Sequence, residues 1–162
     1  MEKMEKRQLS DSKQQRTADL EQIERFKAKF QLSDLLYSRE NDHPLTLQFK
    51  SDPSVTISPD FYSESAGIIG EVHTHYGKLR VGQRHKLAAD ILKMLAYETD
   101  LGRKLEKYII VCSEEEKSYL EGHSYVAKAA KMSDIHVLLY PLNAETEEKV
   151  RQAMEEQDLR NK

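Results

Sequence analysis

Two continuous apolar runs in the second half of the chain constrain its fold more than any other feature. They are KYIIVCS, which begins at Lys107, and IHVLLYP, which begins at Ile135. Runs without alternation between apolar and polar residues are typical of strands buried on both faces of a sheet. A helical pattern separates the two runs, and parallel strands need such a crossover connection. We therefore predict βαβ units and a sheet that is covered by helices.

Four helices are predicted from apolar residues at three- and four-residue steps and from capping residues. They cover residues 17–37, 83–101, 113–131 and 143–157. Gly102 is the expected C-terminal cap of the second helix. Ser113 and Glu116 form a capping-box pattern at the start of the third helix, and Gly122 is expected to interrupt or kink it. Asn143 is the expected N-cap of the last helix.

The first half of the chain contains strand patterns. HPLTLQFK and VTIS alternate around the turn SDPS and predict a hairpin, and AGIIGEVHTH, which ends at His75, predicts a third strand. Gly67 and Gly70 in this strand suggest a closely approached backbone. The predicted order is α-β-β-β-α-β-α-β-α, and we interpret it as a mixed α/β fold with an antiparallel first half and a parallel second half.

The composition agrees with one domain. The chain has 162 residues, of which 33% are charged and 38% apolar, and its formal net charge is −3. We predict a domain over 17–157, between a disordered or frayed arm at 1–16 and a tail at 158–162. The acidic balance argues against a protein that coats nucleic acid, but it is compatible with a local basic patch. Cys112 is the only cysteine, which excludes an internal disulfide and favours a cytoplasmic location. No apolar run has the length of a membrane span, so no membrane partner is expected.

Polar residues at alternating positions of the third strand form the candidate site. The period of two puts Glu71, His73 and His75 on one face, where they line a cleft or a solvated surface. If the preceding strand pairs with this one through the connection FYSESA, the carboxylate of Asp60 comes near Glu71. Two neighbouring carboxylates attract a hard cation such as Mg²⁺. In the alternative interpretation Asp60 is a turn residue after Pro59, and the histidines decorate an edge strand.

A basic segment follows the third strand. Against one acid, Asp90, it holds five cationic residues: Lys78, Arg80, Arg84, Lys86 and Lys93. In a net acidic chain such a segment suits a site that holds a phosphodiester backbone. The alternative is a solvated helix face in which Lys86 and Asp90 pair one turn apart. Gln83 is expected to direct its amide toward the site or, alternatively, to bond the backbone where the helix begins.

The element order and two short motifs resemble the PD-(D/E)xK nuclease superfamily, also described as restriction-endonuclease-like. The motifs are SPD at 58–60 and GEVH at 70–73, and the resemblance covers residues 17–112. It implies an α-β-β-β-α-β core with the active site on the second and third strands.

The resemblance also implies roles for individual residues. Asp60 and Glu71 would bind Mg²⁺ or Mn²⁺, and Gln83 would match the glutamine that often opens the second core helix. Glu24 or Glu40 would supply the acid that sometimes joins them from the first helix.

The sequence departs from the family at His73, which stands where the family has lysine. Three interpretations stay open. His73 assists the attacking water, Lys78 or Lys86 enters the same space, or catalysis has been lost and a nucleic-acid-binding protein remains.

We therefore predict metal-dependent phosphodiester hydrolysis of nucleic acid, with DNA favoured and a homodimer as a further expectation. Four residues are expected to bind the phosphates: Lys78, Arg80, Arg84 and Lys86. The first alternative is a degenerate nuclease fold that acts in nucleic-acid binding or assembly.

A second alternative follows from HTH at 73–75. Two histidines on one strand with a nearby acid can bind Zn²⁺, as in the JAMM-type metalloproteases. That family expects a proline and an aspartate where this chain has Tyr76 and Leu87.

Overall fold

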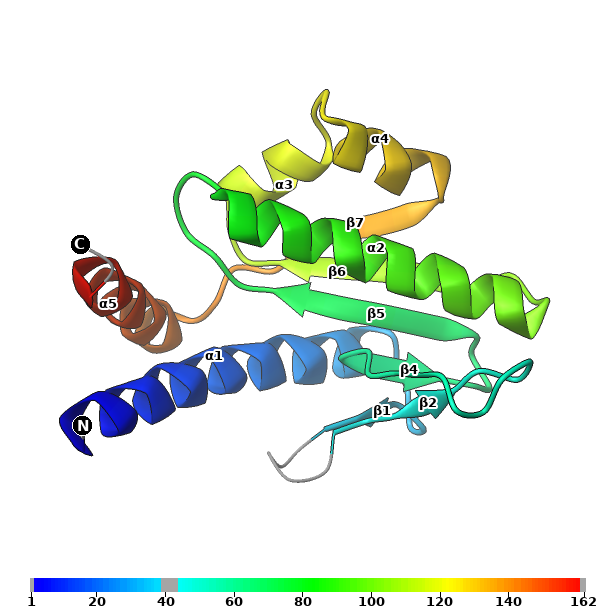
Figure 1. The fold of residues 1–162 in the computed structure, drawn as a ribbon, viewed down its shortest axis with the longest axis horizontal. Helices are drawn as coiled ribbons and strands as arrows, with labels where there is room; N and C mark the ends of the chain where they lie inside the picture. The colour runs from blue at the N-terminus through cyan, green and yellow to red at the C-terminus, as the bar shows by residue number, and fades with distance from the viewer. Residues whose placement is uncertain (1, 39–43, 161–162) are drawn as a thin grey trace.

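The computed structural model describes the backbone of residues 2–38 and 44–160, and the side chains from residue 13 onward within these ranges. Five helices and seven strands lie in this part of the chain (Figure 1). In chain order they are α1 (Glu2–Lys29), β1 (Leu36–Tyr37), β2 (Leu47–Gln48), β3 (Thr56–Ile57), β4 (Phe61–Ser63), β5 (Ile68–His73), α2 (Val81–Leu101), β6 (Glu106–Val111), α3 (Glu114–Leu120), α4 (Tyr125–Met132), β7 (Ile135–Leu139) and α5 (Ala144–Arg160).

The main sheet is mixed and has the order β1-β4-β5-β6-β7. β4 is antiparallel to β1 and β5, whereas β5, β6 and β7 are parallel to one another. The predicted crossovers are confirmed, because α2 connects β5 to β6, and α3 and α4 connect β6 to β7. The predicted hairpin is also confirmed. Its strands, β2 and β3, form a separate two-stranded sheet.

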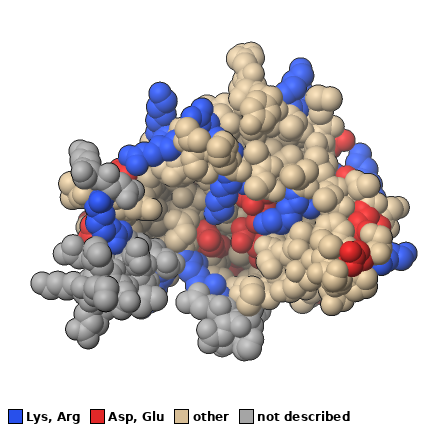
Figure 2. All heavy atoms as spheres, in the orientation of Figure 1, with Lys and Arg blue, Asp and Glu red and all other residues tan. Residues whose placement is uncertain are grey.

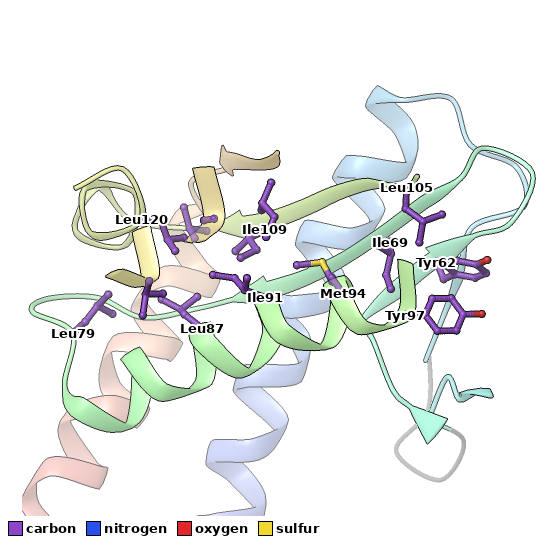
Figure 3. Close-up of a cluster of buried hydrophobic side chains, with 14 residues drawn as sticks. Tyr62, Ile69, Leu79, Leu87, Ile91, Met94, Tyr97, Leu105, Ile109 and Leu120 are labelled. Atoms are coloured by element: carbon purple, nitrogen blue, oxygen red, sulfur yellow. The ribbon is translucent and has the colours of Figure 1, made fainter. Parts of the chain in front are cut away.

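Alternate side chains of β5 enter two different hydrophobic cores. Ile69 belongs to the core beneath α2, where Ile91 and Met94 point toward the sheet (Figure 3). Val72 belongs to the core on the opposite face, where it packs with Phe26 of α1. This alternation was predicted from the period of two. The odd-numbered residues of β5 therefore face α2, and the even-numbered residues face α1.

α1 is held by the last helix as well as by the sheet. Ala18 of α1 is fully buried in a third cluster that includes Cys112 and Val150 of α5. The N-terminal and C-terminal helices thus share a packed interface, and Figure 1 shows them on the same side of the molecule.

Gly70 of β5 makes room for the side chain of Phe61 on the neighbouring strand, β4. The two strands pair Phe61 with Gly70, and a Cβ atom at residue 70 would lie 2.0 Å from the Phe61 ring. The predicted close approach at this glycine is confirmed. Because only hydrogen leaves room for the ring, the glycine sets how β4 lies against β5.

Several predicted helix ends are confirmed by their capping geometry. Gly102 adopts the left-handed conformation, with φ of 64°, at the end of α2. The Ser113 side chain accepts a hydrogen bond from the backbone of Glu116, and Asn143 accepts one from Thr146. The predicted interruption near residue 122 separates α3 from α4.

The end of the first predicted helix is wrong. The apolar period favours a helix over 17–37, but α1 ends at Lys29 because Gln31 adopts a left-handed conformation with φ of 52°. Leu36 lies in β1 instead. At the other end, α1 begins at Glu2, so the arm at 2–16 has a helical backbone.

The interpretation of FYSESA as a connection is also wrong, because it contains β4. Phe61, Tyr62 and Ser63 are all buried, so this strand lacks the alternation by which its neighbours were identified. β4 pairs with β5, while the strand predicted before it, β3, pairs only with β2.

None of the helices in the described part of the chain is both long and apolar enough to cross a membrane.

Candidate active site

The pairing of β4 with β5 brings Asp60 to Glu71. The register pairs Phe61 with Gly70, and continuing it by one residue puts Asp60 opposite Glu71. The backbone N–H of Val72 donates a hydrogen bond of 2.7 Å to Asp60 Oδ2, which fixes the carboxylate against β5. The predicted proximity of the two carboxyl groups is therefore confirmed.

Glu71 is a buried acid among other acids. Its side chain is 3% exposed, and burial raises its pKa to about 10, together with the charges of Asp60 and Asp90 and a hydrogen bond with Asp60. Lys93 acts in the opposite direction, because its Nζ donates to Glu71 Oε1 at 2.9 Å. At neutral pH Glu71 therefore holds a proton unless a further cation joins the site.

Asp90 reaches the same position from α2. Its side chain is buried, and burial raises its pKa, while the charges of Lys93 and Lys86 lower it. Lys93 Nζ lies 3.5 Å from Asp90 Oδ1, but Oδ2 has no hydrogen-bond partner among the residues that the structure describes. Buried carboxylate oxygens are rarely left without a donor, so this atom marks a position that suits a cation or a proton.

A fourth carboxyl group comes from α1 and belongs to Asp19. Burial raises its pKa to about 7, and the charge of Asp60 adds to the effect, whereas Lys86 and Thr74 lower it. Thr74 Oγ1 donates to Asp19 Oδ1 at 3.2 Å. Glu24, one of the two acids predicted for this role, instead accepts a hydrogen bond from the Tyr37 hydroxyl. The other, Glu40, lies outside the described residues.

The lysine nearest the acids is Lys93. It bridges Glu71 and Asp90 and is about a quarter exposed. Of the two lysines predicted to replace the family's lysine, Lys86 acts on Asp19 and Asp90 through its charge, and its side chain is exposed. Lys78 is exposed in the loop after β5.

His73 does not simply take the place of the family's lysine, because its ring is bound by another side chain. It faces α2 and α3, and its Nδ1 forms a hydrogen bond with Glu116 Oε2. The other oxygen of Glu116 accepts from the backbone N–H of Cys112 at 3.1 Å and from the Ser113 hydroxyl at 3.0 Å. Its side chain thus anchors the imidazole. The charge of His73 lowers the pKa of Asp90, so the ring lies beside the acids.

The remaining predicted residues lie at the start of α2 rather than among the acids. Gln83 Oε1 accepts from the backbone N–H of Arg80 at 2.8 Å, which is the helix-entry role given above as the alternative. His75 Nε2 lies 3.1 Å from the carbonyl oxygen of Lys78. A groove beside α5 is lined by all five of the residues in this region: His75, Lys78, Arg80, Gln83 and Arg84.

Figure 2 shows the outcome on the surface. Acidic atoms lie recessed in a hollow near the middle of this face, between α1 and α2, with Lys and Arg atoms on both sides. Among the described residues, no group of three or more His, Cys, Asp or Glu side chains is arranged to hold a metal ion by itself. Lys93 bridges two of the acids, Glu71 and Asp90. Mg²⁺ is commonly held by one or two carboxylates plus waters, a demand that Asp60 and Glu71 meet.

Four residues in and around the site were not predicted from the sequence: Asp19, Asp90, Lys93 and Glu116. One signal was present: Lys86, Asp90 and Lys93 stand four and three residues apart, so they share one face of α2. Comparisons of the chain with protein-family models, curated proteins and solved structures give no match.

Proposed function

We propose that this protein is a nuclease of the PD-(D/E)xK type, which hydrolyses phosphodiester bonds of nucleic acid, DNA favoured, with Mg²⁺ or Mn²⁺. One observation carries the proposal: four carboxyl groups and a lysine from α1, α2 and the β4–β5 pair converge in one recess. They belong to Asp19, Asp60, Glu71, Asp90 and Lys93. Burying this many acids together is costly, and a divalent cation and a phosphate substrate would offset the cost.

The residues suit a hard cation. Asp60 and Glu71 would hold it, and the unpartnered Oδ2 of Asp90 is a further oxygen ligand nearby. The pKa of Glu71 is raised by burial first and by the neighbouring acids second, and proton release from Glu71 would accompany cation binding. The cation would supply Lewis acidity and lower the pKa of a bound water.

Lys93 is the group we assign to the family's lysine. It is bonded to the acid of the second motif, Glu71, although it comes from α2 and not from β5. An ammonium group here can stabilise the negative charge that develops on the phosphate. Among the three interpretations left open at His73, this supports a lysine from elsewhere. His73 is anchored by Glu116, and in this proposal it orders the part of the site next to Asp90.

The zinc-hydrolase alternative receives no support from the histidines. The ring of His73 bonds a carboxylate of α3, whereas His75 bonds a carbonyl oxygen in the loop after β5. The binding-only alternative has one observation in its favour. Lys93 contacts both Glu71 and Asp90, as a purely structural lysine would.

Cleavage assays separate hydrolysis from binding. The full chain is incubated with plasmid, linear duplex and single-stranded DNA and with RNA, in Mg²⁺, Mn²⁺ or EDTA. We expect metal-dependent cleavage that falls at least about 100-fold in Glu71→Gln. Glu145→Gln, which removes an exposed acid of α5, is the matched control. Absence of cleavage under every condition, or full activity of Glu71→Gln, would overturn the proposal.

A further inference from the structure

A groove lies between the loop from β5 to α2 and the C-terminal half of α5. Its volume is about 750 Å³. Residues 75–84 line one side, and Met154, Gln157 and Asp158 of α5 line the other. Figure 1 shows the loop and α5 at the same end of the molecule. The first residue that lines the groove, His75, stands two residues beyond the end of β5 and four beyond Glu71, and at a strand rise of about 3.3 Å per residue this is at most about 13 Å from that acid.

One wall of the groove is cationic. Lys78, Arg80 and Arg84 are exposed there, and Asp158 is the only acid among the described residues that line the groove. The first turn of α2 carries no acid. Val81 is 55% exposed on the same wall, and Met154 faces the groove from α5. The groove thus combines positive charge with apolar surface.

We propose that this groove binds one strand of nucleic acid. Arg80 and Arg84 contact phosphates, and the sugars and bases lie against Val81 and Met154. Grooves of this composition track a single strand, since cations follow the backbone while apolar groups meet the bases. The inference rests on the proposed function, because it treats the groove as the path by which a strand reaches the carboxyl groups.

The size of the groove favours one strand over a duplex. Its volume falls in the range of about 300–1,000 Å³ that encloses ligands of small-molecule size. A few nucleotides match this space. A double helix, whose major groove alone is about 12 Å wide, does not fit inside it.

In the absence of a phosphate, Arg80 forms an ion pair with Asp158. Arg80 Nη2 lies 2.8 Å from Asp158 Oδ1, and the two side chains are 60% and 46% exposed. Ion pairs with this exposure contribute little to stability, so a phosphate oxygen can replace the carboxylate on Arg80. Asp158 therefore competes with the strand.

Fluorescence anisotropy tests the groove without cleavage. The full chain is titrated against a labelled single-stranded oligonucleotide and the duplex of the same sequence, in EDTA and at several salt concentrations. The test variant is Arg80→Gln/Arg84→Gln. The matched control, Arg103→Gln/Lys104→Gln, removes the same charge just beyond the other end of α2, about 30 Å away for a helix of 21 residues.

We expect the wild type to bind the single strand at least about 10-fold more tightly than the duplex. The Arg80/Arg84 variant weakens this binding about 10- to 100-fold, and the slope of log affinity against log salt falls by about 1.4, or about 0.7 per lost phosphate contact. Asp158→Asn strengthens binding. The control stays close to wild type, and melting curves of all variants confirm folding.

Four results would overturn the inference: normal binding by the test variant, equal loss in the test and control variants, tighter binding of the duplex, or displacement of the strand by inorganic phosphate at the same phosphate concentration. The last would indicate a simple anion site. A failure of the groove and a failure of the nuclease proposal give different results. If only the groove is wrong, the arginine variant binds normally while Glu71→Gln still abolishes cleavage; if only hydrolysis is wrong, nothing is cleaved but the arginines still govern binding.

Discussion

Replacing Glu71 by glutamine should make the metal-free protein more stable at neutral pH. In the folded chain burial raises the pKa of Glu71 from 4.5 to about 10, so the folded state keeps a proton that the unfolded state releases above pH 4.5. Stability is therefore lost as the pH rises from 4.5 toward 10. At pH 7 about 2.5 pH units separate the solution from the ordinary pKa, and at roughly 1.4 kcal/mol per unit the loss is about 3 kcal/mol.

Glutamine keeps the shape of the protonated acid and has no proton to lose. The gain of Glu71→Gln over wild type should be near zero at pH 4 and should grow to about 3 kcal/mol at pH 7. Guanidinium denaturation between pH 4 and pH 8, in EDTA, measures it. If the substitution destabilises the protein by the same amount at every pH, the reasoning is refuted. Glu71 would then ionise in the folded chain at the same pH as in the unfolded chain.

Glu98 offers a control of opposite sign. It bonds the buried ammonium group of Lys107 at 2.5 Å, and hydrogen bonds with Lys107 and the backbone of Leu105 lower its pKa. Glu98→Gln should destabilise the protein by about 3 kcal/mol or more at pH 7, because it leaves a buried charge without its partner. The loss should shrink as the pH falls through the pKa of Glu98, and a variant as stable as wild type at pH 7 would contradict the assignment.

Two further substitutions test the site and the strand pair that forms it. Lys93→Met should lower cleavage about 100-fold while Lys131→Met, on an exposed face of α4, should not; equal rates would remove Lys93 from the mechanism. Gly70→Ala should destabilise the fold by roughly 1–3 kcal/mol, because the new methyl group meets the Phe61 ring. Gly82→Ala, where a Cβ meets nothing within 4 Å, should be close to neutral in denaturation, and a similar neutrality at residue 70 would contradict the packing argument.

The parallel half of the fold could be predicted because its signals are local. Continuous apolar runs identify β6 and β7, and the caps at Gly102 and Asn143 mark where α2 ends and α5 begins. β4 could not be found in this way. It is three residues long and entirely buried, so neither length nor alternation separates it from a loop.

The residues of the site show the same contrast between local signals and contacts that depend on the whole fold. The proximity of Asp60 to Glu71 could be predicted because the two residues flank one turn between antiparallel segments, although the segment that pairs with β5 is β4 and not β3. Asp19 and Asp90 belong to helices on opposite faces of the sheet, and their meeting depends on the packing of whole elements. No spacing in the sequence indicates that Asp19 and Asp90 lie close together. Lys93 was visible only as one cation in a basic segment.

The interface between the first and last helices has a consequence for how the protein is made. Asp19 directly follows Ala18, which is buried against Val150 near the middle of α5. The carboxyl group from α1 is therefore held in position by a helix that is made after all the strands of the sheet. A nascent chain that has formed α1 and the strands still lacks this support. The complete acidic recess is thus expected only once α5 has been made and has packed against α1.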